Sequence, residues 1–260
     1  QVGIRQYASA DENNFLRGGA ATFALTEKIH LSAFYSRKKL DANVTDTLDN
    51  VTNEVTFSSL QNSGFHRTQS EYENKDAILE THFGGRIEYI SSALRIGANG
   101  FASRYGGEFD RKLSFYNQFE FASNQNFVAG VDYNYVLRNF NFFGEFSRSQ
   151  NGGIAYVNGV LLSLDSRLSF TMLHRNYGKE YQNLLSNGLA ESSNSWNEKG
   201  IFMGMEAKLN KSFTLTGSMD FFTFPWMRFQ VYSPNSGGKE FITQLSYRKS
   251  RNFTAYFRYR

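Results

Sequence analysis

The sequence predicts an all-β protein, a transmembrane antiparallel up-and-down β-barrel of the outer-membrane type. Three observations support this fold class: apolar residues recur at every second position, the predicted strands are long, and short and long connections alternate along the chain. About 13 strands are visible in the 260 residues. Single-chain bacterial barrels have even strand numbers, so we expect an incomplete segment of a barrel with 14 or more strands.

The alternation indicates strands because successive side chains of a strand point to opposite faces. Residues 126–137 show it most clearly: every second residue from Phe127 to Leu137 is apolar, while Asn126, Asp132 and Asn134 lie between them. The same pattern predicts strands at 1–8, 15–26, 29–40, 78–91, 93–105, 126–137, 140–149, 153–162, 167–177, 200–209, 212–223, 239–248 and 252–260.

Most of these segments have about 9 to 12 residues, against ~5 to 6 in soluble sheets and the ~9 to 11 that cross a bilayer at a tilt. Short turns such as Arg138-Asn139 alternate with long connections, as in outer-membrane barrels with tight periplasmic turns and longer external loops. Across Arg138-Asn139 the apolar row passes from Leu137 to Phe140, as a two-residue hairpin requires. The prediction is one β-barrel domain over residues 1–260, with long external loops near 41–77, 106–125, 178–199 and 224–238.

The two faces of the predicted wall differ in chemistry. Apolar rows such as Ile201, Met203 and Met205 suit contact with lipid. In a soluble β-sandwich such rows would pack against each other in a thin core, and the strands would be shorter. The opposite rows carry charges of both signs and are expected to line a wet lumen: Glu80, His82, Arg86, Glu88, Arg95, Asp132, Glu145, Arg175, Glu206, Lys208, Asp220, Glu240, Arg248 and Arg258.

Composition narrows the alternatives. No stretch approaches the ~18 to 20 consecutive apolar residues of a membrane-spanning helix, which excludes a helical membrane protein. The net charge of +4 is spread along the chain, so no nucleic-acid partner is evident. The absence of cysteine excludes a disulfide framework and thiolate metal sites. The N-terminal QVGIRQYA lacks a leader pattern and begins like a strand, which indicates either a removed signal peptide or a segment of a longer protein; the odd strand count favours the segment.

No catalytic or metal-binding motif stands out. The four histidines, His30, His66, His82 and His174, lie in no known catalytic signature, and we expect no enzyme. A barrel hydrolase would need a nucleophile beside His82 or His174, and remains the least favoured alternative. The run from Asp41 to Asp46 lacks the glycine and terminal glutamate of a calcium loop, so no metal site and no cofactor are expected.

Two predicted external segments are more apolar than exposed loops usually are. Residues 113–123 alternate, and are expected to extend the wall or fold inward. Residues 222–232 crowd aromatic side chains around Pro225 and predict either an inward-folded segment or a protein contact. The residues for such a contact are Phe224, Trp226, Met227, Phe229 and Tyr232.

Three stretches carry a family resemblance: residues 37–76, residues 132–160 (DYNYVLRNFNFFGEFSRSQNGGIAYVNGV) and residues 175–200 (RNYGKEYQNLLSNGLAESSNSWNEKG). They resemble large outer-membrane proteins of Bacteroidetes-type bacteria, in which a periplasmic helix-hairpin-helix region precedes a C-terminal barrel. The resemblance implies that a full-length member continues on both sides of this segment. The helix-hairpin-helix region has no counterpart here, so this sequence has no residues on which to base a DNA-uptake role.

These observations lead to one expectation and one alternative. We expect a barrel in the outer membrane of a Gram-negative bacterium, in contact with the lipid bilayer, whose charged lumen forms a pore or a transport conduit. Loop 41–77 would gate that lumen if it folded inward. The alternative is a structural barrel that anchors a membrane protein complex through its external aromatic loops.

Overall fold

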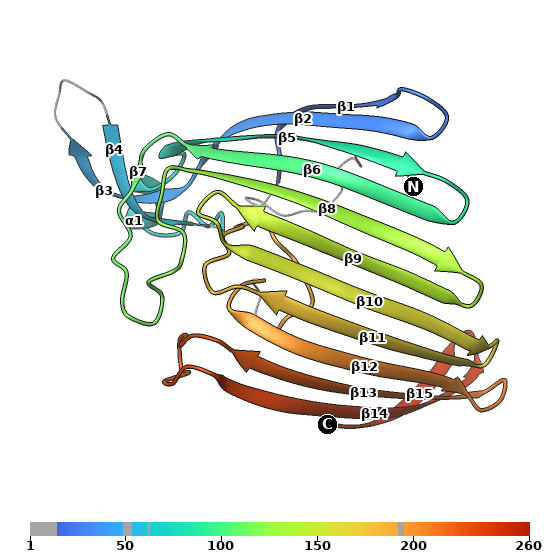
Figure 1. Ribbon diagram of the computed structural model, residues 1–260. Coiled ribbons are helices and arrows are strands. Elements are labelled where there is room, and N and C mark those ends of the chain that lie inside the picture. The colour runs from blue at the N-terminus through green and yellow to red at the C-terminus, as the bar shows by residue number, and fades with distance from the viewer. Residues whose placement is uncertain (1–14, 49–53, 62, 192–194) are drawn as a thin grey trace. The chain divides into compact units, whose positions relative to one another are not determined.

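The computed structural model describes residues 15–48, 54–61, 63–191 and 195–260 and shows an all-β fold. One antiparallel sheet of 12 strands dominates it (Figure 1), with the hydrogen-bonded order β1-β2-β5-β6-β8-β9-β10-β11-β12-β13-β14-β15. Neighbours in the sheet are mostly neighbours in sequence, which is an up-and-down arrangement. Among the described residues no pairing joins β1 to β15. The strands are β1 (Gly18–Ala24), β2 (Ile29–Leu40), β5 (Ile78–Ile90), β6 (Leu94–Tyr105), β8 (Gln125–Leu137), β9 (Phe140–Ser149), β10 (Ile154–Asp165), β11 (Leu168–Tyr177), β12 (Glu198–Lys208), β13 (Phe213–Phe224), β14 (Ser236–Ser250) and β15 (Phe253–Tyr259).

The predicted strands from 15–26 onward all have counterparts in this sheet, which confirms the all-β, up-and-down prediction. The predicted strand at 1–8 lies outside the described residues. The predicted turn at Arg138-Asn139 joins β8 to β9, and Arg138 has a φ of 53°. A positive φ at the first central residue is what a two-residue hairpin of the primed type needs.

By their internal contacts the residues form two compact units. The first contains the described residues up to Ile90 together with Gly97–Gly130, and the second contains Ser91–Ile96 and Val131–Arg260. In the second unit, the register of β9 to β15 places the apolar rows side by side: Met172 opposes Met203, and Met203 opposes Met219. The apolar alternation therefore forms one continuous face in this unit.

In the first unit, the connections at 41–77 and 106–125, predicted as long external loops, contain short regular elements. They form a three-stranded sheet of β3 (Ala42–Leu48), β4 (Glu54–Leu60) and β7 (Glu108–Phe109), together with the short helix α1 (Gln69–Glu73). In Figure 1 these elements lie beyond the ends of β2, β5 and β6. The capping box between Thr68 and Glu71 starts α1, because each side chain accepts from the other residue's backbone N–H.

The buried apolar cluster of the first unit lies where these segments meet, not within the large sheet. It contains Leu40, Ala42, Phe57, Ile78, Tyr105, Phe109 and Phe121. Phe57 stacks on Phe109 with ring centroids 4.8 Å apart. Residues 113–123 form no strand, which corrects the expectation that they extend the wall; Phe121 is instead anchored in this cluster, while Phe115 is exposed.

The described residues contain no helix that is both long and apolar enough to cross a membrane.

Candidate functional site

The strands of the large sheet have two chemically different faces, here called the polar face and the apolar face. On β8 the polar face carries Asn126, Val128 and Asp132, and the apolar face carries Phe127 and Val131. Each strand alternates between the two because its side chains point to opposite sides in turn. The polar face carries the buried charged residues of the sheet and is the candidate site.

All the charged residues predicted to line the lumen lie at polar-face positions of their strands. Within that set, exposure varies. Glu80, His82, Glu88, Arg175 and Asp220 are buried; Arg86, Arg95, Asp132 and Glu240 are partly exposed; Glu145, Glu206, Lys208, Arg248 and Arg258 are exposed. Four of the buried ones lie in two clusters, Glu80 and His82 in the first unit and Arg175 and Asp220 in the second, while Glu88 pairs with Arg86 at 3.5 Å.

In the second unit, Arg175 is the centre of a buried ion-pair cluster. Its Nε donates to Glu198 Oε1 at 2.7 Å and its Nη1 donates to Asp220 Oδ1 at 2.8 Å. Arg175 and Glu198 are fully buried. Nη2 is also buried and has no hydrogen-bond partner in the described part of the chain. The two carboxylates, Glu198 and Asp220, compensate the charge of the buried guanidinium, because burying a charge without an opposite charge is costly.

Gly200 makes room for this guanidinium. It lies directly opposite Arg175 in the register of β11 and β12. A Cβ at Gly200 would lie 2.6 Å from Arg175 Cζ, which is closer than Cβ contacts allow. The glycine is therefore a packing requirement of the cluster.

The loop between β11 and β12 folds over the polar face beside this cluster. Residues 178–191 and 195–197, here called the inner loop, are attached at several points. The buried Tyr181 hydroxyl hydrogen-bonds Ser147 Oγ at 2.7 Å, and Gln182 N donates to Ser149 Oγ at 3.2 Å. Glu191 N donates to both carboxylate oxygens of Glu198, at 3.2 and 3.0 Å. The long connection predicted near 178–199 is present between β11 and β12, and the hydrogen bonds to β9 and β12 are what the sequence did not predict.

The inner loop covers a cavity of about 260 Å³ against β9, β10 and β11. Its lining mixes polar and aromatic side chains, among them Glu145, Ser147, Tyr177, Tyr181 and Asn183. The pKa of Glu191 is raised above the ordinary glutamate value, first by desolvation and then by the like charges of Glu240, Asp220 and Glu198. Bringing Glu191 to this acidic region therefore favours its protonated form.

In the first unit, the second cluster contains Lys38, Glu80 and His82. Glu80 lies between the other two: its Oε2 is 3.5 Å from Lys38 Nζ, and its Oε1 is 3.0 Å from His82 Nε2. The His82 ring is 1% exposed and packs against Phe101 and Tyr105, with ring centroids 5.2 and 6.3 Å away. This packing makes His82 a rigid part of the polar face.

Neither histidine considered for hydrolysis has the required neighbours. Among the described residues, no serine or threonine hydroxyl hydrogen-bonds His82, whose Nδ1 is buried without a partner. His174 lies on the apolar face, where its ring meets Tyr156 edge-on at 5.6 Å. A nucleophile paired with a base is therefore not formed at either ring.

Asp41 has a structural role. Its carboxylate accepts from Asp76 N and contacts His66 Nε2, both at 2.9 Å. Within the described ranges, no group of three or more His, Asp or Glu side chains is arranged to hold a metal ion.

The aromatic residues expected to contact a partner do not act as one surface. Phe224 is buried at the end of β13, and Trp226 is fixed by Asn197, whose Oδ1 accepts from Trp226 N at 2.8 Å and whose Nδ2 donates to Trp226 O at 3.0 Å. Met227 is partly buried. Only Phe229 and Tyr232 of these five are exposed, at 74% and 88%. The available contact surface is therefore smaller than predicted.

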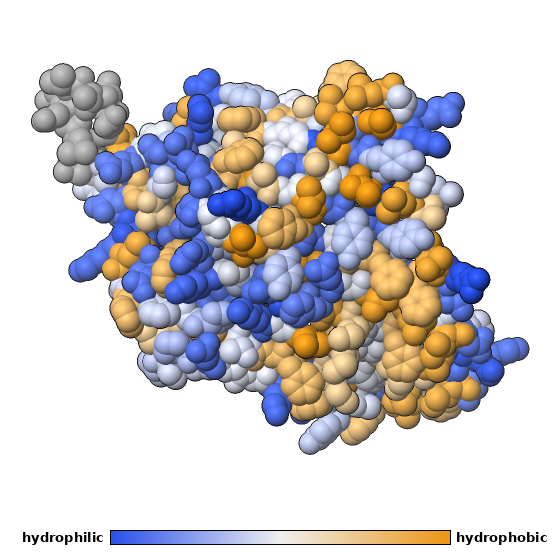
Figure 2. Space-filling model, viewed as in Figure 1, coloured by the Kyte–Doolittle hydropathy of each residue, from blue (hydrophilic) through white to orange (hydrophobic). Residues whose placement is uncertain are grey.

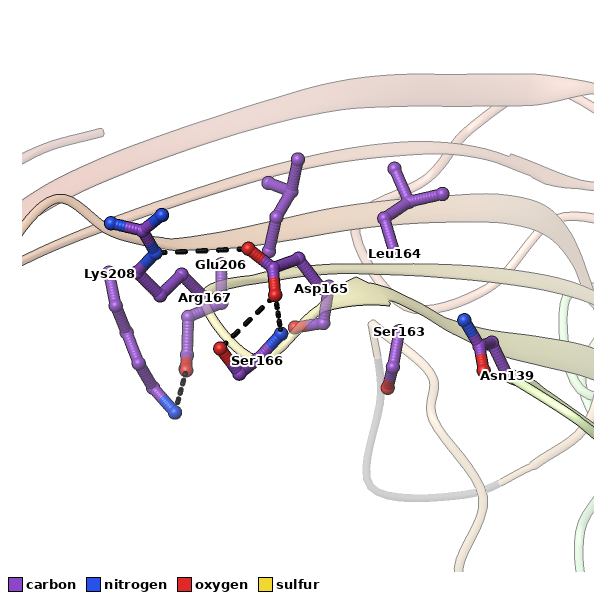
Figure 3. A pocket seen from close by; sticks show the side chains of 10 residues that line it. Asn139, Ser163, Leu164, Asp165, Ser166, Arg167, Glu206 and Lys208 are labelled. Carbon is purple, nitrogen blue, oxygen red and sulfur yellow. Dashed lines mark hydrogen bonds and ion pairs between the residues drawn. The ribbon is translucent and has the colours of Figure 1, made fainter.

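A second hollow, of about 410 Å³, lies at the short turn between β10 and β11 (Figure 3). Asp165 accepts from Ser166 N and Oγ and lies 3.8 Å from Arg167 Nε. Lys208 and Glu206 form an exposed ion pair at 3.8 Å across the same hollow. The polar groups here satisfy one another on an exposed surface, which gives no indication of a ligand.

The sequence interpretation missed Glu198, Lys38 and the inner loop. Glu198 continues the alternation of Gly200, Phe202 and Glu206, so extending the predicted strand by two residues would have found it. Lys38 likewise lies two residues beyond Ser36 on β2. No comparable periodic signal marks residues 178–197. Comparisons with protein-family models and with curated proteins give no match for this chain.

Proposed function

We propose that this chain forms part of the wall of an outer-membrane β-barrel whose polar face lines a conduit for polar solutes. The observation that carries the proposal is the difference between the two faces of the same strands. Val131, Met172, Met203, Met219 and Phe241 are all 38 to 51% exposed on the apolar face. A soluble protein rarely leaves a contiguous apolar surface beyond a few hundred Å² open to water.

The extent of the apolar face fits a bilayer. The apolar row begins at Ile201 on β12 and ends at Leu209, one residue past the strand, a span of about 26 Å at ~3.3 Å per residue. At a tilt of ~40° it covers about 20 Å, close to the ~25 Å apolar band of outer-membrane barrels. Figure 2 shows apolar side chains gathered over the strand ends that lead into the short turns. In the proposed barrel, lipid would cover these apolar side chains and remove them from water.

The polar face suits a hydrated passage, and the inner loop would narrow it. Charges of both signs line this face, and a lumen of 14 or more strands is wider than side chains alone can fill. Because Tyr181 and Gln182 hold the inner loop to β9, we infer that this loop, in place of 41–77, controls access in the second unit. The charged lining would then select solutes by sign and size.

Planar-bilayer recording tests this proposal. The complete barrel protein, of which this chain forms part of the wall, is reconstituted unchanged and with residues 182–190 replaced by a short Gly-Ser linker. We expect ion conductance, with a several-fold rise in the variant because the obstruction is removed. A matched control replaces residues 230–234, which lie between β13 and β14, by the same kind of linker and should leave conductance unaltered. Sealed bilayers with both proteins, despite confirmed insertion, would contradict a conduit.

A second candidate function rests on Phe229 and Tyr232, which are exposed between β13 and β14. Such aromatic side chains are enriched at protein contacts, so the barrel could instead anchor a complex. The change Phe229→Ser with Tyr232→Ser should then release a co-purifying protein without altering conductance. Trp226 is unsuitable for this test because its backbone is tied to Asn197.

A further inference from the structure

The apolar face of the second unit changes to a polar, cationic surface near its long loops. Asn176, Lys199 and Thr223 lie side by side in register on β11, β12 and β13. The adjacent row, closer to the short turns, contains His174, Ile201, Phe221 and Lys239. Both lysines are exposed and therefore lie where the apolar surface ends.

These side chains surround a hollow of about 490 Å³. Its lining includes His174, Lys199, Ile201, Phe221 and Lys239, so cations lie next to an apolar floor. Lys239 Nζ lies 5.9 Å from the centre of the Phe221 ring, which holds its ammonium group over the hollow. The hollow combines the two requirements of a lipid headgroup region, a positive charge and an apolar surface beside it.

The charge pattern leaves this hollow open to an anion from outside. Each acidic residue of β12, β13 and β14, namely Glu198, Glu206, Asp220 and Glu240, lies on the polar face. Neither Lys199 nor Lys239 forms an ion pair within the residues that the structure describes. The apolar face therefore offers unopposed positive charge here.

We propose that this hollow binds the phosphate group of an anionic membrane lipid, with Lys199 and Lys239 as the cationic partners and Ile201 and Phe221 against the acyl region. The inference rests on the proposed membrane insertion. Basic residues at a membrane surface attract anionic lipids, and their position at the end of the apolar row places them at headgroup depth. His174 would add to the attraction when protonated.

Native mass spectrometry of the full chain in zwitterionic micelles tests the site, with phosphatidic acid and phosphatidylcholine as probes. We expect selective binding of phosphatidic acid, and about tenfold weaker binding in the Lys199→Gln, Lys239→Gln double variant. The matched control is Lys211→Gln with Lys249→Gln, which removes the same charge at the short turns and should bind as the unchanged protein does.

Four outcomes overturn the inference. Equal phosphatidic acid binding by the Lys199→Gln, Lys239→Gln variant would remove these lysines from the site. Equal competition by inorganic phosphate at matched concentration would indicate a soluble-anion site. Protease protection in phosphatidylcholine vesicles separates the remaining cases: insertion without a preference for phosphatidic acid defeats only this site, whereas failure to insert defeats the proposed function and the site together.

Discussion

At the scale of single residues, Arg175 shows how the polar face tolerates charge in a buried place. Its guanidinium is enclosed by Glu198 and Asp220, at 2.7 and 2.8 Å. The arrangement is stable only as a set, because removing one member leaves the others buried and uncompensated. Its position on β11 could be predicted from alternation, but its partners could not, since they come from strands whose register depends on the complete sheet.

The first prediction concerns this cluster. Arg175→Met leaves two buried carboxylates without a cation, and we expect the free energy of unfolding to fall by about 3 to 5 kcal/mol. Urea titration in vesicles, followed by tryptophan fluorescence, measures it. Adding Glu198→Gln and Asp220→Asn should recover most of the loss. The matched control is Arg258→Met at an exposed position, which should change the free energy of unfolding by less than ~1 kcal/mol. Equal losses of stability in the Arg175→Met and Arg258→Met proteins would contradict the account.

The second prediction concerns the space beside Arg175. Gly200→Ala places a methyl group against the guanidinium, and we expect a loss of about 1 to 3 kcal/mol from overpacking. Gly217→Ala on the neighbouring β13 is the matched control, because its nearest contact would be Ile242 O at 4.0 Å. The same urea titration compares the two variants. A Gly200→Ala protein as stable as the Gly217→Ala protein would show that Arg175 can move aside freely.

At the scale of elements, the strands and the short turns could be predicted, whereas the internal structure of the long connections could not. Strand alternation is a local property, so even the ends of β2 and β9 agree with the sequence prediction. The hairpin β3–β4 has irregular register, and β7 has only two residues. Their formation depends on burying Phe57 and Phe121 in a shared cluster, which only the folded chain brings together. The inner loop likewise depends on partners far along the sequence, such as Ser147.

The third prediction follows from Glu191 in the inner loop. Its raised pKa means that the packed loop binds this proton more tightly than a detached loop does. Packing is therefore most stable below the ordinary glutamate pKa and loses this contribution as pH rises through the raised value. The chain has no cysteine, so Ser195→Cys provides a buried reporter in the loop.

Thiol labelling of the Ser195→Cys protein, normalised to the exposed Ser166→Cys protein at each pH, measures this opening. We expect normalised labelling to increase with pH through the range where Glu191 ionises. Glu191→Gln should flatten the profile, because a neutral amide has neither the desolvation cost of the carboxylate nor its repulsion from Glu240, Asp220 and Glu198. A profile unchanged by Glu191→Gln would assign the pH dependence to another group.

At the scale of the whole molecule, the central claim is that the apolar face meets lipid and the polar face meets water. Acidic side chains of β12 to β14 lie on the polar face, and large apolar side chains such as Met203 and Met219 are exposed on the other. Sequence alternation predicted this division because it depends only on strand geometry. Under the proposed membrane insertion, lipid would cover these exposed apolar side chains.

The most direct test is a spin-label scan of β12 in lipid vesicles, with single cysteines placed at residues 201 to 206 of the full chain. Labels at Ile201, Met203 and Met205 should collide with dissolved oxygen, which concentrates in lipid. Labels at Phe202, Gly204 and Glu206 should collide with a water-soluble nickel chelate. We predict that the two profiles alternate out of phase with a period of two residues. Profiles in phase, or chelate access at every position, would contradict the membrane-wall account.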